Sequence, residues 1–285
     1  YRCSADVIAM ANRLIALKYN VTGGAADKIE AAEMVAAKTA SPHDGGSDVV
    51  SLKDKTKLDA LREEAKRPNV AVITLPQYIE EAKRELGTQL VFTPEQAKGL
   101  EYAKVVLWRP LDCDEAEQAC KKLGSAIKGV ATAAHRPKNG QGDESLLPYF
   151  NGLITAVTRA QGWVVMVQDP SHVIKTIYDA LNPLASPQMA AKPPIAEPLP
   201  QPTPETSTAE WLAEVKRLMA QGLEKQARGI YTQTLRHSNA DFEAFKQSLH
   251  QQQETTKPAK MPAAVAAAAA TEATPLPPKT KKIST

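Results

Sequence analysis

The chain of 285 residues is poor in cysteine and contains no long apolar run. Its three cysteines, Cys3, Cys113 and Cys120, are too few and too irregularly spaced for a disulfide framework, and no Cys-x-x-Cys or His-Cys spacing indicates a zinc site. This usage fits a reducing, intracellular setting, and we expect a cytoplasmic protein. No apolar run approaches the about 18 residues of a membrane span, so we expect no membrane partner.

Aromatic residues are also scarce, at 5% of the chain, and the net charge is only +3. With 43% apolar residues the chain can still build a core, made mainly of Ala, Val, Leu and Ile. The small charge neither requires nor excludes nucleic acid, because a local groove can be basic on a nearly neutral chain.

A phosphate-binding loop is missing, since no G-x-x-x-x-G-K-[ST] run occurs in the sequence. The chain therefore offers no loop to cradle the β- and γ-phosphates of a nucleotide or to hold magnesium through a hydroxyl. Asp112, Asp114 and Glu115 follow an apolar run but begin four residues beyond it, and we interpret them as the start of a helix, where acids suit the dipole. The five histidines are scattered, so neither a metal site nor a catalytic triad is predicted.

Short runs of β-branched residues alternate with helical patterns through the first 185 residues, which predicts βαβ units and a parallel sheet. Gly87 is expected to end one helix, and the glycine-rich residues 41–47 are expected to form a loop. The expected strands are 49–52, 70–75, 90–92, 104–108 and 163–167. The expected helices are 5–17, 56–67, 76–86, 112–123, one that ends near Arg159, and 171–181, with 27–38 as an uncertain one.

The composition changes after residue 185. Seven prolines between Pro187 and Pro204 predict an extended linker over 186–208. Apolar residues then recur at helical spacing, which predicts a small helical element over 209–252 that needs a partner surface, with a separate protein as one candidate. Ala, Pro and Lys dominate 253–285, for which we expect a disordered tail.

Two stretches carry most of the polar residues of interest. The first, LVFTPEQAKGLEYAKVVLW from Leu90, is a polar loop between two strands, and the second, YFNGLITAVTRAQGWVVMVQ from Tyr149, is a helix, an arginine and a strand. The run YRCSADVIAMANRLI precedes both.

These three motifs, in this order, resemble the second RecA-like motor domain of superfamily 1 DNA helicases of the UvrD/Rep kind. The resemblance covers nearly all of residues 1–168 and implies a RecA-like parallel sheet of about five strands flanked by helices. It also implies ATP as cofactor, single-stranded DNA as partner, and a first RecA-like P-loop domain, upstream or in trans, that holds the Mg²⁺. Because the sequence begins inside a motif, at Tyr1, we expect a fragment or a mis-called start.

The resemblance implies roles for the ATP-facing residues. Arg2 and Arg159 would contact the γ-phosphate held on the other motor domain, and Glu101 would accept hydrogen bonds from the ribose. Gly99 would permit a backbone conformation or a close approach that a Cβ hinders. Without the motifs, the arginines would be read as surface ion pairs and Glu101 as a solvated loop acid.

The same resemblance assigns Thr93 to the nucleic-acid backbone, with strand capping as the alternative. Gln96 and Lys98 lie in the same loop, and Lys98 pairs with either a phosphate or an acidic neighbour. Glu95 stands where the family often has histidine, which puts strand affinity in doubt. The alternative interpretation is therefore a non-catalytic RecA-like module that binds nucleic acid or protein.

Overall fold

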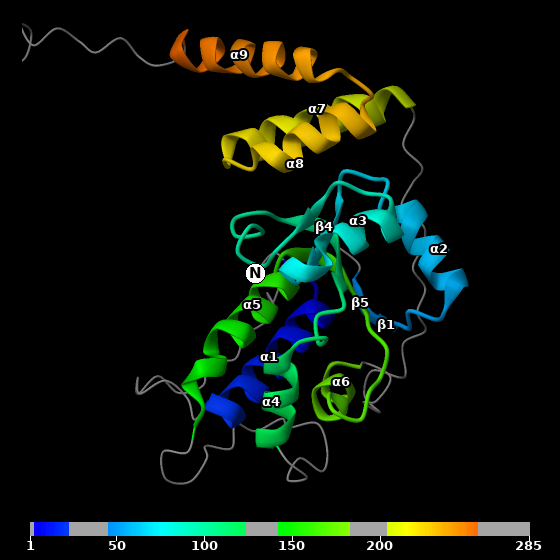
Figure 1. Ribbon diagram of the computed structural model, residues 1–285, viewed down its shortest axis with the longest axis vertical. Coiled ribbons are helices and arrows are strands. Elements are labelled where there is room, and N and C mark those ends of the chain that lie inside the picture. Colours follow the sequence, from blue (N-terminus) through cyan, green and yellow to red (C-terminus); the bar gives the residue numbers. More distant parts are fainter. Residues whose placement is uncertain (1–2, 23–44, 124–141, 183–203, 256–285) are drawn as a thin grey trace, which may run out of the picture. The chain divides into compact units, whose positions relative to one another are not determined.

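The computed structural model describes residues 3–22, 45–123, 142–182 and 204–255, within two compact units of the chain, 1–238 and 239–285. Within the first unit the described residues form an α/β domain around a five-stranded parallel sheet, as the sequence predicts (Figure 1). Arg2, the uncertain helix 27–38 and most of the proline-rich segment lie outside the described residues. So does the tail from residue 256 onward.

The strands of this sheet lie in the order β1-β5-β4-β2-β3. They span Gly46–Val50 (β1), Val70–Thr74 (β2), Val91–Phe92 (β3), Tyr102–Trp108 (β4) and Ala160–Val167 (β5). The central strands β4 and β5 are almost wholly buried, because helices cover both faces of the sheet.

One face of the sheet packs against α2 (Lys55–Glu64) and α3 (Ile79–Leu86). Alternate residues of the strands point to this side, since side chains of a strand alternate between its faces. A single core cluster joins these strand residues to Leu61 of α2, to Ala65 at the C-cap of α2, and to Ala82 and Leu86 of α3. The strand members are Val50, Val70, Val72, Val91, Val106, Trp108, Val165 and Val167.

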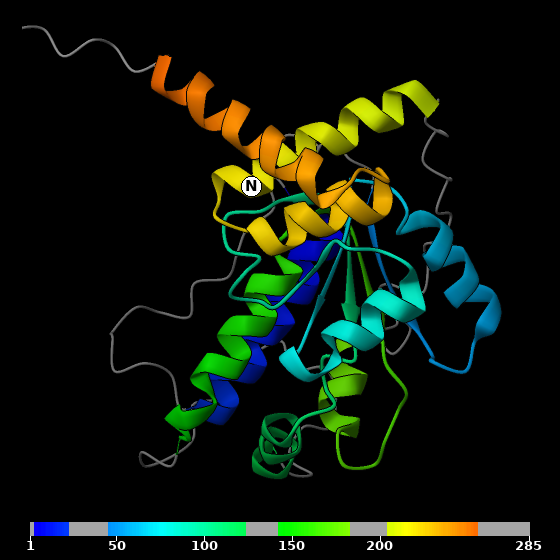
Figure 2. The ribbon, with the colours of Figure 1, turned by 45° about the horizontal axis from the view of Figure 1, so that its top comes forward.

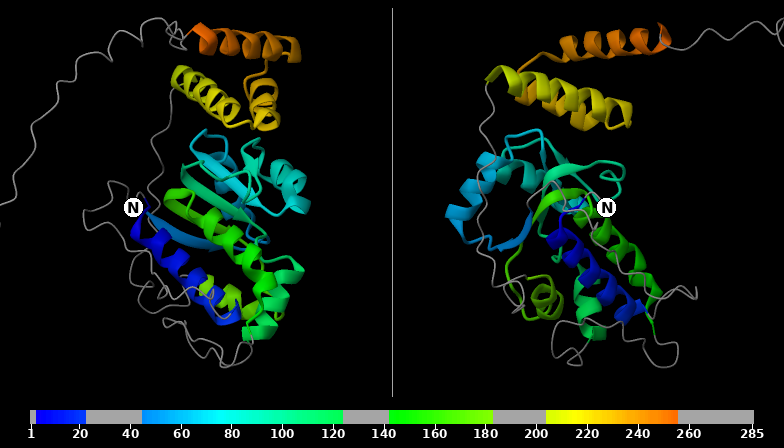
Figure 3. Two further views of the ribbon diagram at one scale, coloured as in Figure 1. Left: turned by 90° about the vertical axis from the view of Figure 1, so that its left-hand side faces the viewer. Right: turned by 180° about the vertical axis from the view of Figure 1, so that it is seen from behind.

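The opposite face is covered by α1 (Ala5–Thr22) and α5 (Leu147–Val157), which lie side by side (Figures 2 and 3). Helices α4 (Asp114–Leu123) and α6 (Lys175–Leu181) pack against α1 on the same side. The first turn of α4 carries Asp114 and Glu115, in agreement with their interpretation as helix-start acids.

Strand β1 begins earlier than the sequence predicts. Residues 46–47, assigned to a loop because of their glycines, pair with Trp163 and Val164 of β5. A Cβ on Gly46 would lie 2.3 Å from the Trp163 ring, so glycine here lets the indole approach the strand rather than marking a turn. Gly87, by contrast, ends α3 in the left-handed conformation, as expected.

The first unit also contains the helices that follow the proline-rich segment. Helix α7 spans Pro204–Ala220, α8 spans Glu224–Gly229, and a π-helical turn, η5, covers Ile230–Thr234. Trp211, Val215, Leu218 and Ile230 are buried. Helix α9 (Asn239–Thr255) is the described part of the second unit.

Candidate functional site

The polar loop 93–101 connects β3 to β4 and spans the length of the sheet. Phe92, at the end of β3, is in register with Ile73, which in turn faces Leu107 of β4. Glu101, at the other end of the loop, precedes Tyr102, the first residue of β4. Five strand residues correspond to roughly 17 Å. The loop therefore returns from the carboxyl end of the sheet to its amino end.

At its start, the loop is a turn closed by Thr93 and Gln96. The N–H of Thr93 donates to Gln96 Oε1 at 3.0 Å, and the N–H of Gln96 donates to Thr93 Oγ1 at 3.3 Å. This reciprocal pair is the geometry of a capping box, and Thr93 is only 9% exposed. The capping alternative for Thr93 is thus present, and its contact with nucleic acid stays a prediction.

Lys98 and Gly99 form the exposed tip of the loop. Gly99 has a φ of 81°, a conformation that side chains disfavour, and a Cβ there would meet only Gln221 Oε1 at 4.0 Å. Of the two reasons considered for this glycine, the backbone conformation is therefore the one the geometry supports.

Glu101 and Arg159 lie next to each other, where β4 and β5 begin. The N–H of Tyr102 donates to the carbonyl of Arg159 at 2.9 Å, and the Glu101 carboxylate accepts from Gln161 Nε2 at 3.1 Å. The Arg159 guanidinium turns back on the loop, since Nη1 donates to the Leu100 carbonyl at 3.3 Å. Both side chains are half-buried.

The start of the described chain lies at the same place. Cys3 Sγ is 3.8 Å from the Thr158 carbonyl, and Ser4 donates its N–H to Gln161 and its hydroxyl to Gly162, both at 2.7 Å. Burial raises the pKa of Cys3, the Glu101 carboxylate raises it further, and Arg159 lowers it. Cys3, the residue after Arg2, is therefore close enough to Glu101 and Arg159 for both charges to change its pKa. Arg2 itself is outside the described range.

Helix α7 adds residues to this site that the sequence did not single out. Arg217 Nη1 donates to the Glu101 carbonyl at 3.0 Å, and Arg217 Nη2 donates to Glu214 at 2.8 Å. The Tyr102 hydroxyl donates to the same Glu214 oxygen at 2.8 Å, and Glu214 is 7% exposed. The only sequence signal was the Glu-x-x-Arg spacing on one helix face, which is common on solvated helices.

A second charged cluster occupies the carboxyl end of β4. Arg109, with a φ of 48°, contacts Glu81 through Nη1 at 3.0 Å and Asp112 through Nε at 2.7 Å. Its guanidinium also lies over the Tyr78 ring, 4.3 Å from the centroid. Asp112 therefore forms an ion pair with Arg109 through one carboxylate oxygen, and Gln168 Nε2 donates to its second oxygen at 2.7 Å.

The described ranges bring together no group of three His, Cys, Asp or Glu side chains that could hold a metal ion. None of the helices in this part of the chain is both long and apolar enough to cross a membrane. Comparison with protein-family models found no match, and neither did a search of curated proteins.

Besides the Arg217–Glu214 pair, the amino end of the sheet offers the guanidinium of Arg159 and the carboxylate of Glu101, both half-buried and both hydrogen-bonded within the domain. A guanidinium can stabilise charge on phosphate oxygens, and a carboxylate can accept from hydroxyl groups. These two groups alone cannot enclose a triphosphate, so a nucleotide would need a second domain with a phosphate loop.

Proposed function

We propose that this chain is the C-terminal motor half of a UvrD-like ATP-dependent DNA helicase or translocase, inactive without a P-loop domain. The observation that carries the proposal is the meeting of three motif segments at one end of the sheet: Cys3 beside Thr158, Glu101 beside Gln161, and Arg159 against Leu100. These segments are more than 50 residues apart in the sequence, as the numbering shows.

In this proposal Arg159 and Arg2 stabilise the charge that develops on the transferred phosphoryl group. To do so, the Arg159 guanidinium exchanges the neutral Leu100 and Thr155 carbonyls for anionic oxygens, which form stronger, charge-assisted hydrogen bonds. Glu101 accepts from the ribose hydroxyls, and Gly99 shapes the loop that carries it. ATP supplies the phosphoryl group, and the Mg²⁺ is held by the P-loop domain.

Thr93, Gln96 and Lys98 form the proposed nucleic-acid side of the same loop. The exposed ammonium of Lys98 can contact a phosphate, and the Thr93 hydroxyl still has a hydrogen to donate while it accepts from the Gln96 N–H. The loop joins the two ends of the sheet. A DNA strand bound at Thr93 and a nucleotide bound at Glu101 would therefore contact the same loop.

The second candidate function is a non-catalytic module that binds nucleic acid or protein. The absence of a phosphate loop from the 285 residues favours it, and so does the exposed acid Glu95 beside the proposed strand path. The adjacent positions of Glu101 and Arg159 argue against it, because the motor proposal gives both side chains a role in addition to their hydrogen bonds within the domain.

The test is ATP turnover, with and without single-stranded DNA, by a protein that joins this chain to its P-loop domain. Arg159→Ala is expected to lower turnover by about a hundredfold or more, because an arginine finger supplies roughly 10³- to 10⁵-fold. Arg84→Ala, which removes an exposed arginine of α3, is the matched control. Equal turnover in the two variants, or none in folded wild-type protein, would retire the motor proposal.

A further inference from the structure

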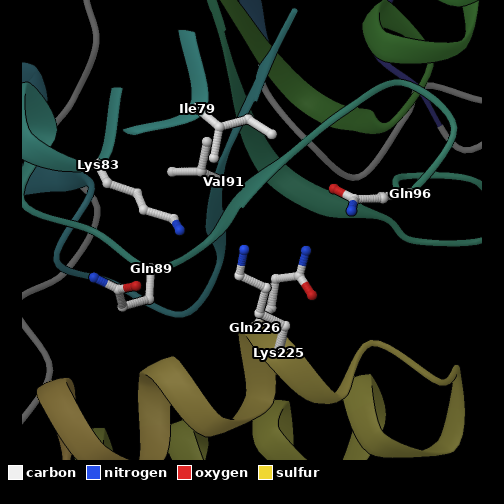
Figure 4. A pocket seen from close by; sticks show the side chains of 7 residues that line it. All are labelled: Ile79, Lys83, Gln89, Val91, Gln96, Lys225 and Gln226. Atoms are coloured by element: carbon white, nitrogen blue, oxygen red, sulfur yellow. The ribbon is translucent and has the colours of Figure 1, made fainter. Parts of the chain in front are cut away.

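A small hollow lies where α8 faces α3 and β3, and it has room for about 50 Å³ (Figure 4). Its walls carry two lysines, Lys83 of α3 and Lys225 of α8, and apolar atoms of Ile79 and Val91. Three carboxamide side chains complete it, those of Gln89, Gln96 and Gln226. The lining therefore has two positive charges and no acid.

The carboxylate of Glu80 contacts one of the two lysines. Glu80 accepts a hydrogen bond from Lys83 Nζ at 2.9 Å. That bond lowers the pKa of Glu80, as do the charge of Lys83 and, more weakly, that of Lys225. The Glu80 side chain is 76% exposed, so this is a solvated surface pair of small free energy. An anion in the hollow would compete with a weakly held partner.

Size and chemistry restrict the ligand. A space of about 50 Å³ admits the two unesterified oxygens of a phosphodiester. Two ammonium groups with nearby amide donors suit such oxygens. Gln96 Oε1 already accepts from the Thr93 N–H, so Nε2 is the end of this side chain that can donate to a ligand.

Position links the hollow to the polar loop. Gln96 belongs both to the lining and to the turn with Thr93, so the hollow adjoins the proposed strand path. The other wall comes from α8, whose neighbour η5 is held against the domain by Gln89 Nε2 donating to Gln233 at 2.7 Å. The site thus lies where α8 meets the α/β domain.

We propose that this hollow binds a backbone phosphate of single-stranded DNA, with Lys83 and Lys225 as the paired cations. The inference rests on the nucleic-acid side of the proposed function and extends it, since it makes α8 part of the strand path. It gives the helical element a role in binding DNA in addition to any role in binding protein.

The test is fluorescence anisotropy with a labelled oligo-dT of about 15 nucleotides and the full chain, repeated over a range of salt concentrations. Each phosphate contact contributes about 0.7 to the slope of log K against log salt for a single strand. Because the two lysines share one phosphate in this proposal, Lys83→Gln with Lys225→Gln should flatten the slope by about 0.7, with roughly 5- to 10-fold weaker binding at about 50 mM salt. Glu80→Gln should tighten binding, because it removes the competing carboxylate.

Two controls separate the possible failures. Lys121→Gln, at an exposed residue of α4, removes one positive charge, as the single variants Lys83→Gln and Lys225→Gln each do, and should leave the slope unchanged. Lys98→Gln tests the loop itself. A slope that depends on Lys98 but not on Lys83 or Lys225 would overturn this inference alone. A slope insensitive to all three lysines would overturn the proposed DNA path as well. An equal effect of Lys121→Gln would show that binding depends only on the net charge of the protein, which would also overturn this inference. An oligo-rU arm distinguishes RNA as the source of the phosphate.

Discussion

Arg217 of α7 lies over the ring of Tyr102, with its Cζ 4.6 Å from the ring centroid, although 115 residues separate the two in the chain. Burial raises the pKa of Tyr102, and the charge of Glu214 raises it further, so the hydroxyl stays protonated and donates to Glu214. Arg217 neutralises the same carboxylate. Helix α7, which is not part of the sheet or its flanking helices, thus contacts the segment that carries Glu101 and Tyr102.

The first prediction concerns this contact. Arg217→Ala should lower the free energy of unfolding by about 2 kcal/mol, because it removes the cation beside the buried Glu214 carboxylate and leaves the Tyr102 hydroxyl to donate to it. The measurement is urea unfolding. Lys175→Ala, which removes the exposed pair with Asp179, is the control and should cost less than about 0.5 kcal/mol. Equal effects would mean that α7 contributes no specific contact.

The second prediction concerns Cys113. Burial raises the pKa of its thiol from 9.0 to about 12. At pH 10 the folded protein should therefore react with iodoacetamide at Cys113 at least about tenfold more slowly than the urea-unfolded protein, followed by mass spectrometry. Between pH 9 and 12 the folded thiol keeps a proton that the unfolded thiol releases, so stability should fall as pH rises through this window. Similar rates in both states would contradict the raised pKa.

The third prediction separates the two roles of Thr93. Thr93→Ala should cost about 1 kcal/mol, because the Gln96 N–H loses its acceptor, whereas Thr93→Ser keeps the hydroxyl and most of the stability. Urea unfolding measures this cost. If the hydroxyl also contacts DNA, Thr93→Ala weakens oligonucleotide binding and Thr93→Ser restores it. Unchanged affinity in folded Thr93→Ala protein would leave capping as its function.

The fourth prediction is a pair of glycine substitutions with opposite signs. Gly99→Ala should destabilise the fold by about 1 kcal/mol, because φ is 81° and no neighbour lies closer than 4.0 Å to relieve or add strain. Gly152→Ala, inside α5, should stabilise it by about 0.5 kcal/mol, since a Cβ there makes ordinary contact with Pro94 at 3.5 Å. Thermal unfolding of both variants, compared with wild type, gives the two signs. If both substitutions changed the stability in the same direction, the positive φ of Gly99 would not be what requires glycine at that position.

The sheet was predictable from the sequence because its strands are short runs of β-branched residues between helical patterns, as in Val70–Thr74. The start of β1 was missed because a glycine pair resembles a turn, and only the position of Trp163 reveals that Gly46 permits close packing. Predictions from local sequence patterns use residues that are neighbours in the chain, whereas the contact of Gly46 with Trp163 joins residues more than a hundred positions apart.

The candidate site likewise has a part that local sequence patterns indicate and a part that depends on tertiary packing. The turn at Thr93 and Gln96 has the spacing of three that a capping box requires, and the sequence alone suggested only a cap at Thr93, without Gln96 as its partner. The contact of Arg217 with Tyr102 and Glu101 depends on where α7 packs, and no periodicity within 209–252 encodes that surface. The hollow at Lys83 and Lys225 was missed for the same reason.

Strand β3 is two residues long and forms one edge of the sheet, and Val91 shares the lining of the hollow with Lys225 and Gln226 of α8. An open strand edge can recruit a second extended chain, whereas a very short edge beside lysines and a covering helix resists it. We therefore expect α8 to limit edge-to-edge pairing at β3. A protein cut before α7 would lose the α8 wall beside Val91 and should associate edge to edge on storage more readily than the full chain.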